Sequence, residues 1–394
     1  MSERGQQRHT GVRRCPYCLS PVRVHVVDPS AYTPPYDHAL CGALAVAGTK
    51  VELFTSRFPY GVVANPNGYI RYEFFYRATL GSAGGRLRML SKLAQHLPDM
   101  LRYRRAARTA DVVHFQWLTV QHLDGHLLPT GRPLVLTAHD VLPREPRPGQ
   151  LAAQRRLYGR FDAIVVHSER GRRRLIDELG ADSERVHVIP HGVFTHLAEI
   201  EAPLLPAKPD RPVVLMFGLM RPYKGIDVLL DAWCGAGSEE APIVDAELWL
   251  VGMPRMDISA LQASAPANVR FVPRFVGDDE LGPYFRHADL IVLPYLQADQ
   301  SGVLFTALAF GKPLLLSDVG GFPEMASTGA ARIVPAGDPR ALGRALRELL
   351  SDRASLDEMC MRAKAAADGR YSWKAVAAAH IELYERLLQE GRRR

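Results

Sequence analysis

Residues 300–313 read QSGVLFTALAFGKP, and residues 318–324 read DVGGFPE. The stretch begins with a small polar turn, continues as an apolar helical run that stops at Gly311-Lys312-Pro313, and passes through an apolar strand to a Gly-Gly loop. The first turn of a helix presents backbone N–H groups that bind anions without any side chain. This order of features predicts an αβ unit that holds the phosphates of a nucleoside diphosphate.

A second segment supplies positive charge. Residues 217–225 read FGLMRPYKG and place Arg221 and Lys224 three residues apart in a turn between Gly218 and Gly225. Cations at the start of a helix neutralise a pyrophosphate as its sugar leaves. We therefore expect Arg221 and Lys224 to bind the phosphates of the nucleotide and to act in catalysis as the sugar leaves. The alternative is a solvated pair in an ordinary loop.

Short apolar strands alternate with helical segments along most of the chain, which predicts parallel sheets with helices on both faces and ligands beyond the carboxyl ends of the strands. A length of 394 residues favours two domains. The proline-rich segment 199–211 interrupts the alternation and is typical of a linker. We expect a flexible leader over residues 1–21, a first Rossmann-like domain over 22–203 and a second over 204–372. The expected strands are Val22–Val27, Lys50–Thr55, Val112–Phe115, Leu134–Thr137, Ala163–His167 and Val186–Ile189, then Val213–Phe217, Glu247–Val251, Val269–Phe271, Leu290–Leu293, Pro313–Ser317 and Ala331–Val334.

The two phosphate-binding segments within this two-domain pattern resemble the retaining glycosyltransferases of family 4, which have the GT-B fold. The resemblance extends over nearly all of residues 22–390 and is most specific in the second domain. It implies an α/β fold of two doubly wound, Rossmann-like domains facing across a cleft, with the C-terminal helix 373–394 packing back on the first. It also implies transfer of a hexose-type sugar from a UDP- or GDP-linked donor in the second domain to an acceptor in the first, with no metal and no other cofactor.

For the donor, the resemblance implies that residues 299–303, in a turn and the first turn of a helix, contact the nucleotide sugar. It implies further donor contacts from Phe275 and Thr306. The family usually has glutamates at the positions of Ala298 and Thr306; this sequence has neither, and we expect Asp299 to take over part of their work. The expected donor-binding residues are Arg221, Lys224, Phe275, Asp299, Gln300, Ser301, Gly302, Val303 and Thr306.

On the acceptor side, polar residues follow the strands of the first domain. His139 ends one strand, and the resemblance implies that it orients the transferred hexose; a structural histidine is the alternative. Asp140, Gln116, Tyr36 and Asp37 are the expected acceptor-binding residues. The acceptor is expected to be a saccharide, a glycolipid or a small molecule, in the biosynthesis of cell-surface polysaccharide or glycoconjugates.

Composition and cysteine spacing argue against a membrane-spanning protein, a metal site and nucleic-acid binding. Hydrophobic residues make up 47% and charged residues 23% of the chain, and no apolar run is long enough to span a membrane, so we expect a cytoplasmic protein. Cys15 and Cys18 lack a second ligand pair at zinc spacing, so no metal site is expected. No sequence signature favours nucleic acid.

Positive charge is concentrated in the first half. Residues 1–200 contain 27 Lys and Arg against 17 Asp and Glu, a net +10 within the formal +7 of the chain. Residues 86–108 combine basic side chains with leucines at helical spacing (Leu87, Leu90, Leu93, Leu97 and Leu101). We expect the leucines to pack on the domain core; the alternative is a helix on an anionic membrane at the inner face.

Two other functions fit the same motifs. A non-catalytic scaffold in a glycosyltransferase complex would bind nucleotide without turnover, and the missing glutamates favour it. A sugar-nucleotide epimerase on the same fold would consume its substrate without an acceptor. Both phosphate-binding segments are intact, which favours the transferase.

Overall fold

The computed structural model describes residues 21–59, 61, 63–81, 85–142, 149–201, 208–236 and 241–393. Residues 1–20 of the expected leader, with Cys15 and Cys18, and residues 202–207 of the proline-rich segment lie outside the described residues. Within the described part of the chain, no helix has the length and apolar character needed to cross a membrane.

The first half of the chain forms a seven-stranded sheet in the order β3-β2-β1-β4-β5-β6-β7, with all neighbours parallel. Its strands are β1 Arg23–Asp28, β2 Lys50–Ser56, β3 Ile70–Phe75, β4 Val112–Phe115, β5 Leu134–Thr137, β6 Ala163–Val166 and β7 Val186–Val188. Its helices are α1 Pro34–Val46, α2 Arg86–Ala106, the 3₁₀ turn η1 Ala107–Thr109, α3 Gln121–Leu127, α4 Gln150–Tyr158, α5 Glu169–Leu179 and α6 Thr195–Glu199. The strands β4, β5 and β6 are buried at every position, as expected for a sheet covered on both faces.

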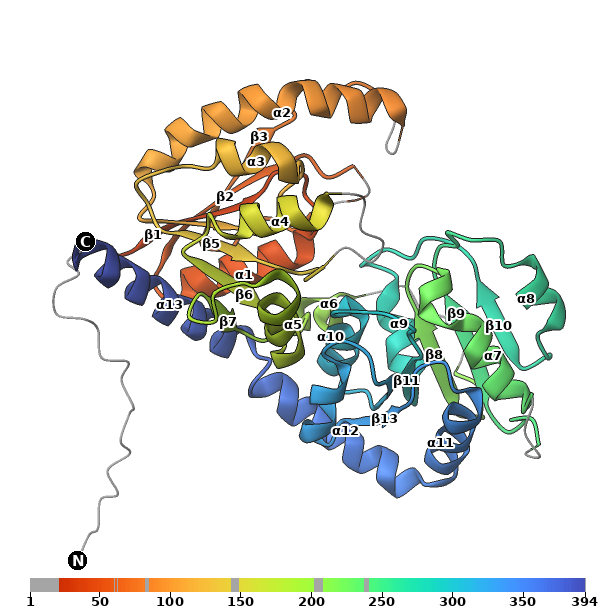
Figure 1. The fold of residues 1–394 in the computed structure, drawn as a ribbon. Coiled ribbons are helices and arrows are strands. Elements are labelled where there is room, and N and C mark those ends of the chain that lie inside the picture. Colours follow the sequence, from red (N-terminus) through yellow and green to blue (C-terminus); the bar gives the residue numbers. More distant parts are fainter. Residues whose placement is uncertain are drawn as a thin grey trace, which may run out of the picture.

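The second half forms a six-stranded parallel sheet in the order β10-β9-β8-β11-β12-β13. Its strands are β8 Val213–Phe217, β9 Glu247–Val251, β10 Val269–Val272, β11 Leu290–Leu293, β12 Leu314–Ser317 and β13 Ala331–Val334. The helical elements are η2 Pro222–Lys224, α7 Ile226–Cys234, α8 Ser259–Ser264, α9 Leu281–His287, α10 Gly302–Ala309, η3 Phe322–Thr328, α11 Pro339–Ser351, α12 Arg353–Asp368 and α13 Trp373–Arg393. Two sheets of this kind confirm the expected fold class (Figure 1).

The last helix, α13, leaves the second sheet and packs along α1 of the first (Figure 1). Its buried side chains include Val376, His380 and Tyr384. At its start, the ring of Trp373 lies against Gly192, where a Cβ would collide with the indole. Its indole N–H donates to the Val193 carbonyl at 2.6 Å, which fixes the start of the helix beside the segment that joins the two sheets.

Two features differ from the sequence-based expectations. The edge strand β3 was not expected. The expectation that the leucines of α2 pack on the domain core is wrong: Leu87, Leu90, Leu93, Leu97 and Leu101 are 41–59% exposed. The buried face of α2 consists instead of His96, Asp99, Met100 and Tyr103.

That polar face is buried because it has hydrogen-bond partners. The Asp99 carboxylate accepts from the Tyr76 backbone N–H at 2.7 Å, and His96 Nε2 lies 2.6 Å from the Asp124 carboxylate. Burial of polar groups that keep such hydrogen bonds costs little free energy, so these side chains can hold the helix against the domain in place of leucines.

Candidate active site

The ammonium group of Lys224 is the centre of the second-domain site. Lys224 ends the 3₁₀ turn η2 directly after β8 and is buried. Its Nζ donates a hydrogen bond to the hydroxyl of Tyr295 at 2.7 Å and lies 4.6 Å from the centre of that ring. The Tyr295 hydroxyl in turn lies 3.4 Å from Ser301 Oγ, so the lysine and the start of α10 are joined through one tyrosine.

Three glycines allow the backbone to close around this lysine. Gly218 has φ +107°, and a Cβ there would lie 3.2 Å from Lys224 Nζ and 3.4 Å from Val303. Gly252, at φ +144°, supports it from the next strand, where a Cβ would collide with the Gly218 carbonyl. Gly225, at φ +64°, passes against the Pro294 carbonyl. A side chain at any of these positions is disfavoured both by the backbone angle and by the space.

The N-terminus of α10 faces the same region. Ser301 precedes the helix, and its side chain makes no capping hydrogen bond. As the first residues of an α-helix, Gly302 and Val303 have N–H groups without an intrahelical acceptor. Thr306 is buried, and its hydroxyl donates to the Gly302 carbonyl at 3.0 Å. Gln300 is half-buried beside Gly321, where a Cβ would collide with its amide.

Asp299 connects the two domains. One carboxylate oxygen accepts from Arg174 Nη1 of α5 at 2.6 Å, and the other accepts from the Val141 backbone N–H at 2.9 Å. Val141 is two residues after His139, so the turn before α10 is tied to the strand end of the expected acceptor side. Arg170 adds to this contact, since its backbone N–H donates to Glu324 at 3.1 Å and its guanidinium to the Asp318 carbonyl at 3.2 Å.

Two expected donor residues lie at the rim. Arg221 is exposed and precedes η2, and its carbonyl accepts from the Lys224 backbone N–H at 3.0 Å. Phe275 is 52% exposed and follows β10. Their exposure leaves both side chains accessible to a ligand, in contrast to Lys224.

His139 lies in a line of hydrogen-bonded groups. Its Nε2 is 3.1 Å from Gln116 Oε1, and its Nδ1 is 3.3 Å from His167 Nε2. The ring stacks on Trp117 with centroids 5.1 Å apart. Burial, followed by the nearby histidines, lowers the pKa of His139 well below its usual value, so the ring is neutral. Both ring nitrogens have protein partners, so a hydrogen bond to a sugar requires one of these contacts to be given up.

The line extends from His139 into the fold. Gln116 is fully buried, and its Nε2 is 3.3 Å from His114 Nε2. The other nitrogen of His114 shares a 2.7 Å hydrogen bond with the Tyr384 hydroxyl of α13. The C-terminal helix therefore helps to set the position of His139 through two buried side chains. Asp140, next to His139, is exposed.

Tyr36 and Asp37, at the start of α1, are both buried. Tyr36 packs between His139, His191 and Trp373, with ring centroids 4.7–5.2 Å apart, so its ring is buried among aromatic side chains. The Asp37 carboxyl faces a small cavity, and burial together with Asp28 raises its pKa well above the usual value.

The structure thus brings together Lys224, Ser301 and Val303, and joins Asp299 to the segment after His139. Phe275 and Tyr36 are not part of these contacts. No sequence pattern assigned a role to Tyr295 or Arg174. Tyr295 lies just beyond β11, and strand ends are where ligand-binding residues of such sheets occur. Arg174 gave no local signal, because its partner is 125 residues away.

Comparison with known sequences places this chain in a family. The family model described as Glycosyltransferase Family 4 matches residues 36–197, and the model described as Glycosyl transferases group 1 matches residues 211–352. Together the two matches cover most of the chain, which belongs to the family 4, or group 1, glycosyltransferases.

Individual relatives agree with this assignment. The D-inositol 3-phosphate glycosyltransferase of Jonesia denitrificans is 26% identical over 387 residues, covering 88% of this chain and 89% of the relative. The phosphatidyl-myo-inositol mannosyltransferase of Mycobacterium leprae is 33% identical over 234 residues, covering 58% of this chain and 60% of the relative.

Solved structures share the fold. Sucrose-phosphate synthase from Thermosynechococcus elongatus superposes with a TM-score of 0.71 at 20% identity, covering 94% of this chain and all of that one. Anabaena HepE, in complex with UDP-glucose, superposes with a TM-score of 0.67 at 17% identity, covering 92% of this chain and 99% of that one. These neighbours confirm the GT-B fold expected from the sequence.

Proposed function

We propose that this glycosyltransferase moves a hexose-type sugar from a UDP- or GDP-linked donor to a saccharide, glycolipid or small-molecule acceptor, with retention of configuration and without a divalent metal. Beside the nucleotide sugar and the acceptor, the reaction uses no cofactor. The reaction takes place in the cytoplasm and is a step in the biosynthesis of cell-surface polysaccharide or glycoconjugates. Family membership and the names of the relatives support the reaction class, and the second-domain geometry supports the donor site.

The buried ammonium group of Lys224 carries the proposal. Within the described residues, no carboxylate lies within ion-pair distance of its Nζ. Burial of a cation costs a large desolvation free energy unless an anionic partner offsets it. A diphosphate beside Tyr295 and the α10 N-terminus would supply that partner and would also accept from the N–H groups of Gly302 and Val303.

The same groups account for chemistry without a metal. Negative charge develops on the diphosphate as the glycosidic bond breaks, and a fixed cation and a helix N-terminus lower the energy of that state. Arg221 adds a second cation from the rim. In a retaining transfer, the leaving phosphate itself takes the acceptor proton, so His139 needs only to orient the hexose.

Thermal unfolding with UDP, GDP, ADP and dTDP in EDTA tests the donor site. A ligand near 100 times its Kd stabilises the folded state by about 2.7 kcal/mol. We expect one nucleotide to raise the Tm of the wild type and of the exposed control Lys374→Ala, and not that of Lys224→Ala. No shift with any nucleotide would refute the donor site.

Turnover separates the alternatives. A transferase releases the nucleotide from its sugar only when an acceptor is present, whereas an epimerase converts the sugar nucleotide alone. A scaffold gives the thermal shift without either product. Sugar transfer that persists in EDTA is the result expected for the proposal, and transfer that is lost in EDTA and restored by a divalent cation would contradict its metal independence.

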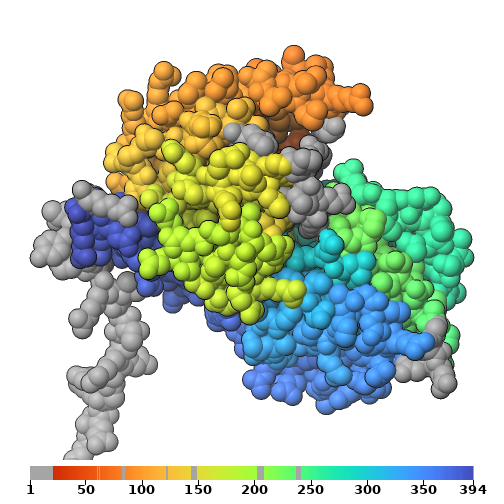
Figure 2. Space-filling view, in the orientation of Figure 1, coloured from red at the N-terminus to blue at the C-terminus, as the bar shows by residue number. Residues whose placement is uncertain are grey.

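We also propose that α2 places the enzyme on the inner face of an anionic membrane. The exposed leucines are joined by Met89, 64% exposed, and Leu80, 63% exposed, and α2 forms one edge of the molecule (Figure 2). Alongside them α2 carries six basic residues, Arg86, Arg88, Lys92, Arg102, Arg104 and Arg105, against one carboxylate, the buried Asp99. Apolar side chains flanked by cations match an interface of anionic lipids.

Co-sedimentation with phosphatidylcholine vesicles, with and without phosphatidylglycerol, tests this surface. Full burial of one leucine contributes about 2 kcal/mol, so Leu90→Glu with Leu97→Glu is expected to abolish binding to the anionic vesicles. Met361→Glu, an equally exposed position on α12, is the control. Binding that is unchanged in the α2 variant, or absent in the wild type, would refute the membrane surface.

A further inference from the structure

A groove lined by arginines lies outside the site described above. It occupies about 880 Å³ beside the edge strand β3, between the segment that follows β2 and the first turn of α2. Arg57 follows β2, Arg71 lies within β3, Arg77 follows β3 and Arg88 lies on α2. Four cations thus line one groove, together with a single carboxylate, that of Glu73.

Four guanidinium groups against one carboxylate leave the described lining of the groove with a net positive charge. Within the described residues, none of the four arginines forms an ion pair. Arg71 Nη1 donates to the Ala64 carbonyl at 2.7 Å, and Arg77 Nε donates to the Glu73 carbonyl at 2.7 Å. A guanidinium has five N–H donors, so these bonds hold the two side chains in place and leave donors for a ligand.

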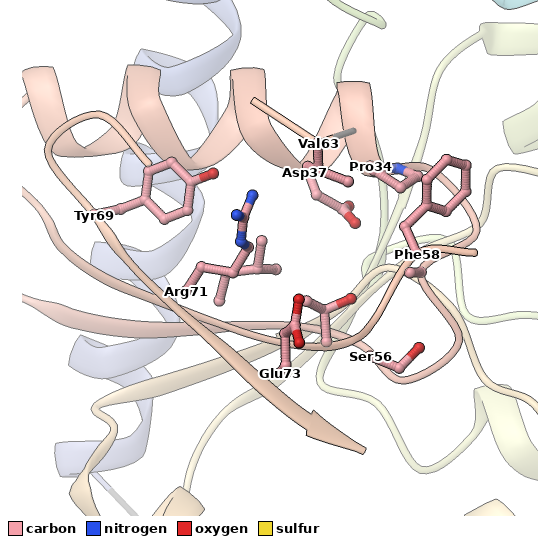
Figure 3. Close-up of a pocket in the computed structure, with 11 residues that line it drawn as sticks. Pro34, Asp37, Ser56, Phe58, Val63, Tyr69, Arg71 and Glu73 are labelled. Carbon is pink, nitrogen blue, oxygen red and sulfur yellow. The ribbon is translucent and has the colours of Figure 1, made fainter. Parts of the chain in front are cut away.

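A smaller cavity adjoins the groove and shares Phe58, Arg71 and Glu73 with it. Its volume of about 30 Å³ is enough for roughly two waters. The buried oxygens Asp37 Oδ1 and Ser56 Oγ have no hydrogen-bond partner within the described structure. Figure 3 shows Arg71 and Glu73 of β3 beneath Asp37 of α1 around this cavity. Unsatisfied buried oxygens beside a cationic groove indicate a place for hydroxyl groups, from water or from a ligand.

Contacts link the groove to His139. The Tyr76 hydroxyl, in the groove lining, donates to Thr119 Oγ1 at 3.4 Å, and Thr119 lies 3.1 Å from Ser30 Oγ. Tyr32 packs on Trp117, with ring centroids 5.2 Å apart, and Trp117 stacks on His139. The groove and His139 therefore lie along the same carboxyl edge of the first sheet, the side on which ligands of parallel sheets bind.

We propose that this arginine groove binds a phosphate group of the acceptor, so that the acceptor substrate is a phosphate-bearing polyol or lipid. This rests on the proposed function, in which the first domain binds the acceptor. A doubly charged phosphate accepts several hydrogen bonds from guanidinium groups, and arginine forks fit its geometry. The α2 leucines begin beside Arg88, so either a lipid phosphate at a membrane or a free sugar phosphate can supply this group.

The probes are D-inositol 3-phosphate and its uncharged counterpart inositol, titrated against the full-length protein by calorimetry. We expect the wild type to bind the phosphate at low salt, more weakly at high salt, and not to bind inositol. Arg57→Gln with Arg88→Gln is expected to raise the Kd by about tenfold for each arginine removed. Arg105→Gln, near the far end of α2, is the control for a general loss of positive charge.

Vesicles distinguish the source of the phosphate. If D-inositol 3-phosphate does not bind, we expect the wild type to bind phosphatidylcholine vesicles that contain phosphatidic acid more tightly than vesicles with the same charge from phosphatidylglycerol. The Arg57→Gln with Arg88→Gln variant is expected to lose this preference. Equal binding of the wild type and this variant with both probes, or no binding of either probe, overturns the proposal.

The donor site supplies an independent check. The groove variant is expected to keep the full nucleotide-induced rise in Tm, because none of its changes touches the second domain. A normal nucleotide shift with unchanged phosphate binding refutes the groove alone. Absence of a nucleotide shift in the wild type refutes the proposed function instead.

Discussion

At the scale of single residues, buried neutral histidines make the folded state sensitive to acid. Burial is the largest cause that lowers the pKa of His25, His167 and His380, each to about 4. In the unfolded chain a histidine has a pKa of about 6.5. Between these two values the unfolded state binds protons that the folded state does not. The free energy of unfolding is therefore highest, with respect to these histidines, above about pH 6.5, and it decreases as the pH falls toward 4.

His380 offers a test on one side chain. Its Nδ1 donates to the Val376 carbonyl at 2.8 Å, whereas its Nε2 is buried without a partner in the described structure. We expect His380→Leu to keep the stability of the wild type above pH 7. As the pH falls from about 6.5 to 4, the free energy of unfolding of this variant should decrease by roughly 3 kcal/mol less than that of the wild type. Urea unfolding at a series of pH values measures this difference. The exposed His126→Leu is the control, and identical pH profiles for wild type and His380→Leu would contradict the expectation.

At the scale of elements, the sequence predicted the strands that are buried on both sides. Every expected strand is present, with ends that differ by about one residue, because a continuous apolar run of this length fits a covered parallel strand. The strand β3 gave no such signal. It pairs with β2 on one side only, and Ile70 and Tyr72 are exposed, so an edge strand needs no apolar run.

Helix α2 shows a second limit of the sequence pattern. Leucine spacing predicted the helix but not which of its faces has a neighbour. The face that packs is fixed by Tyr76 and Asp124, which lie more than 20 residues away from the groups they bind. Hydrophobic periodicity indicates where a buried face is favourable, and a polar face with fitted partners can be buried instead.

The sequence likewise predicted some residues of the candidate site and missed others. Strand ends and glycine turns indicated Lys224, Ser301, Gln116 and His139, because a local pattern places side chains at the edge of a sheet. The partner of Asp299 depends on how the two domains meet. No pattern within either domain specifies that geometry, so Arg174 could be identified only in the folded molecule.

At the scale of the whole molecule, the turn before α10 is held against the first domain. Arg174 and Val141 bind Asp299, Arg170 binds Glu324, and the rings of His191 and Phe305 stack 4.2 Å apart. The segment with α5, coloured yellow-green, touches the blue part of the second domain in Figure 2. These contacts surround the proposed phosphate site, so a motion that separates the two domains would also disturb that site.

Replacing Arg174 by Gln is expected to shift the molecule toward an open arrangement. The ion pair is partly exposed and is worth at most about 1 kcal/mol, a change of roughly fivefold in the ratio of closed to open molecules. Small-angle scattering without nucleotide should show a larger radius of gyration than the wild type, and the Kd of the nucleotide found in the thermal panel should rise several-fold. The neighbouring, exposed Arg173→Gln removes the same charge from α5 and should change neither quantity. If Arg174→Gln leaves both the radius and the Kd unchanged, the Arg174 contact does not hold the domains closed, and closure must depend on the Val141 contact and the ring stacking between His191 and Phe305.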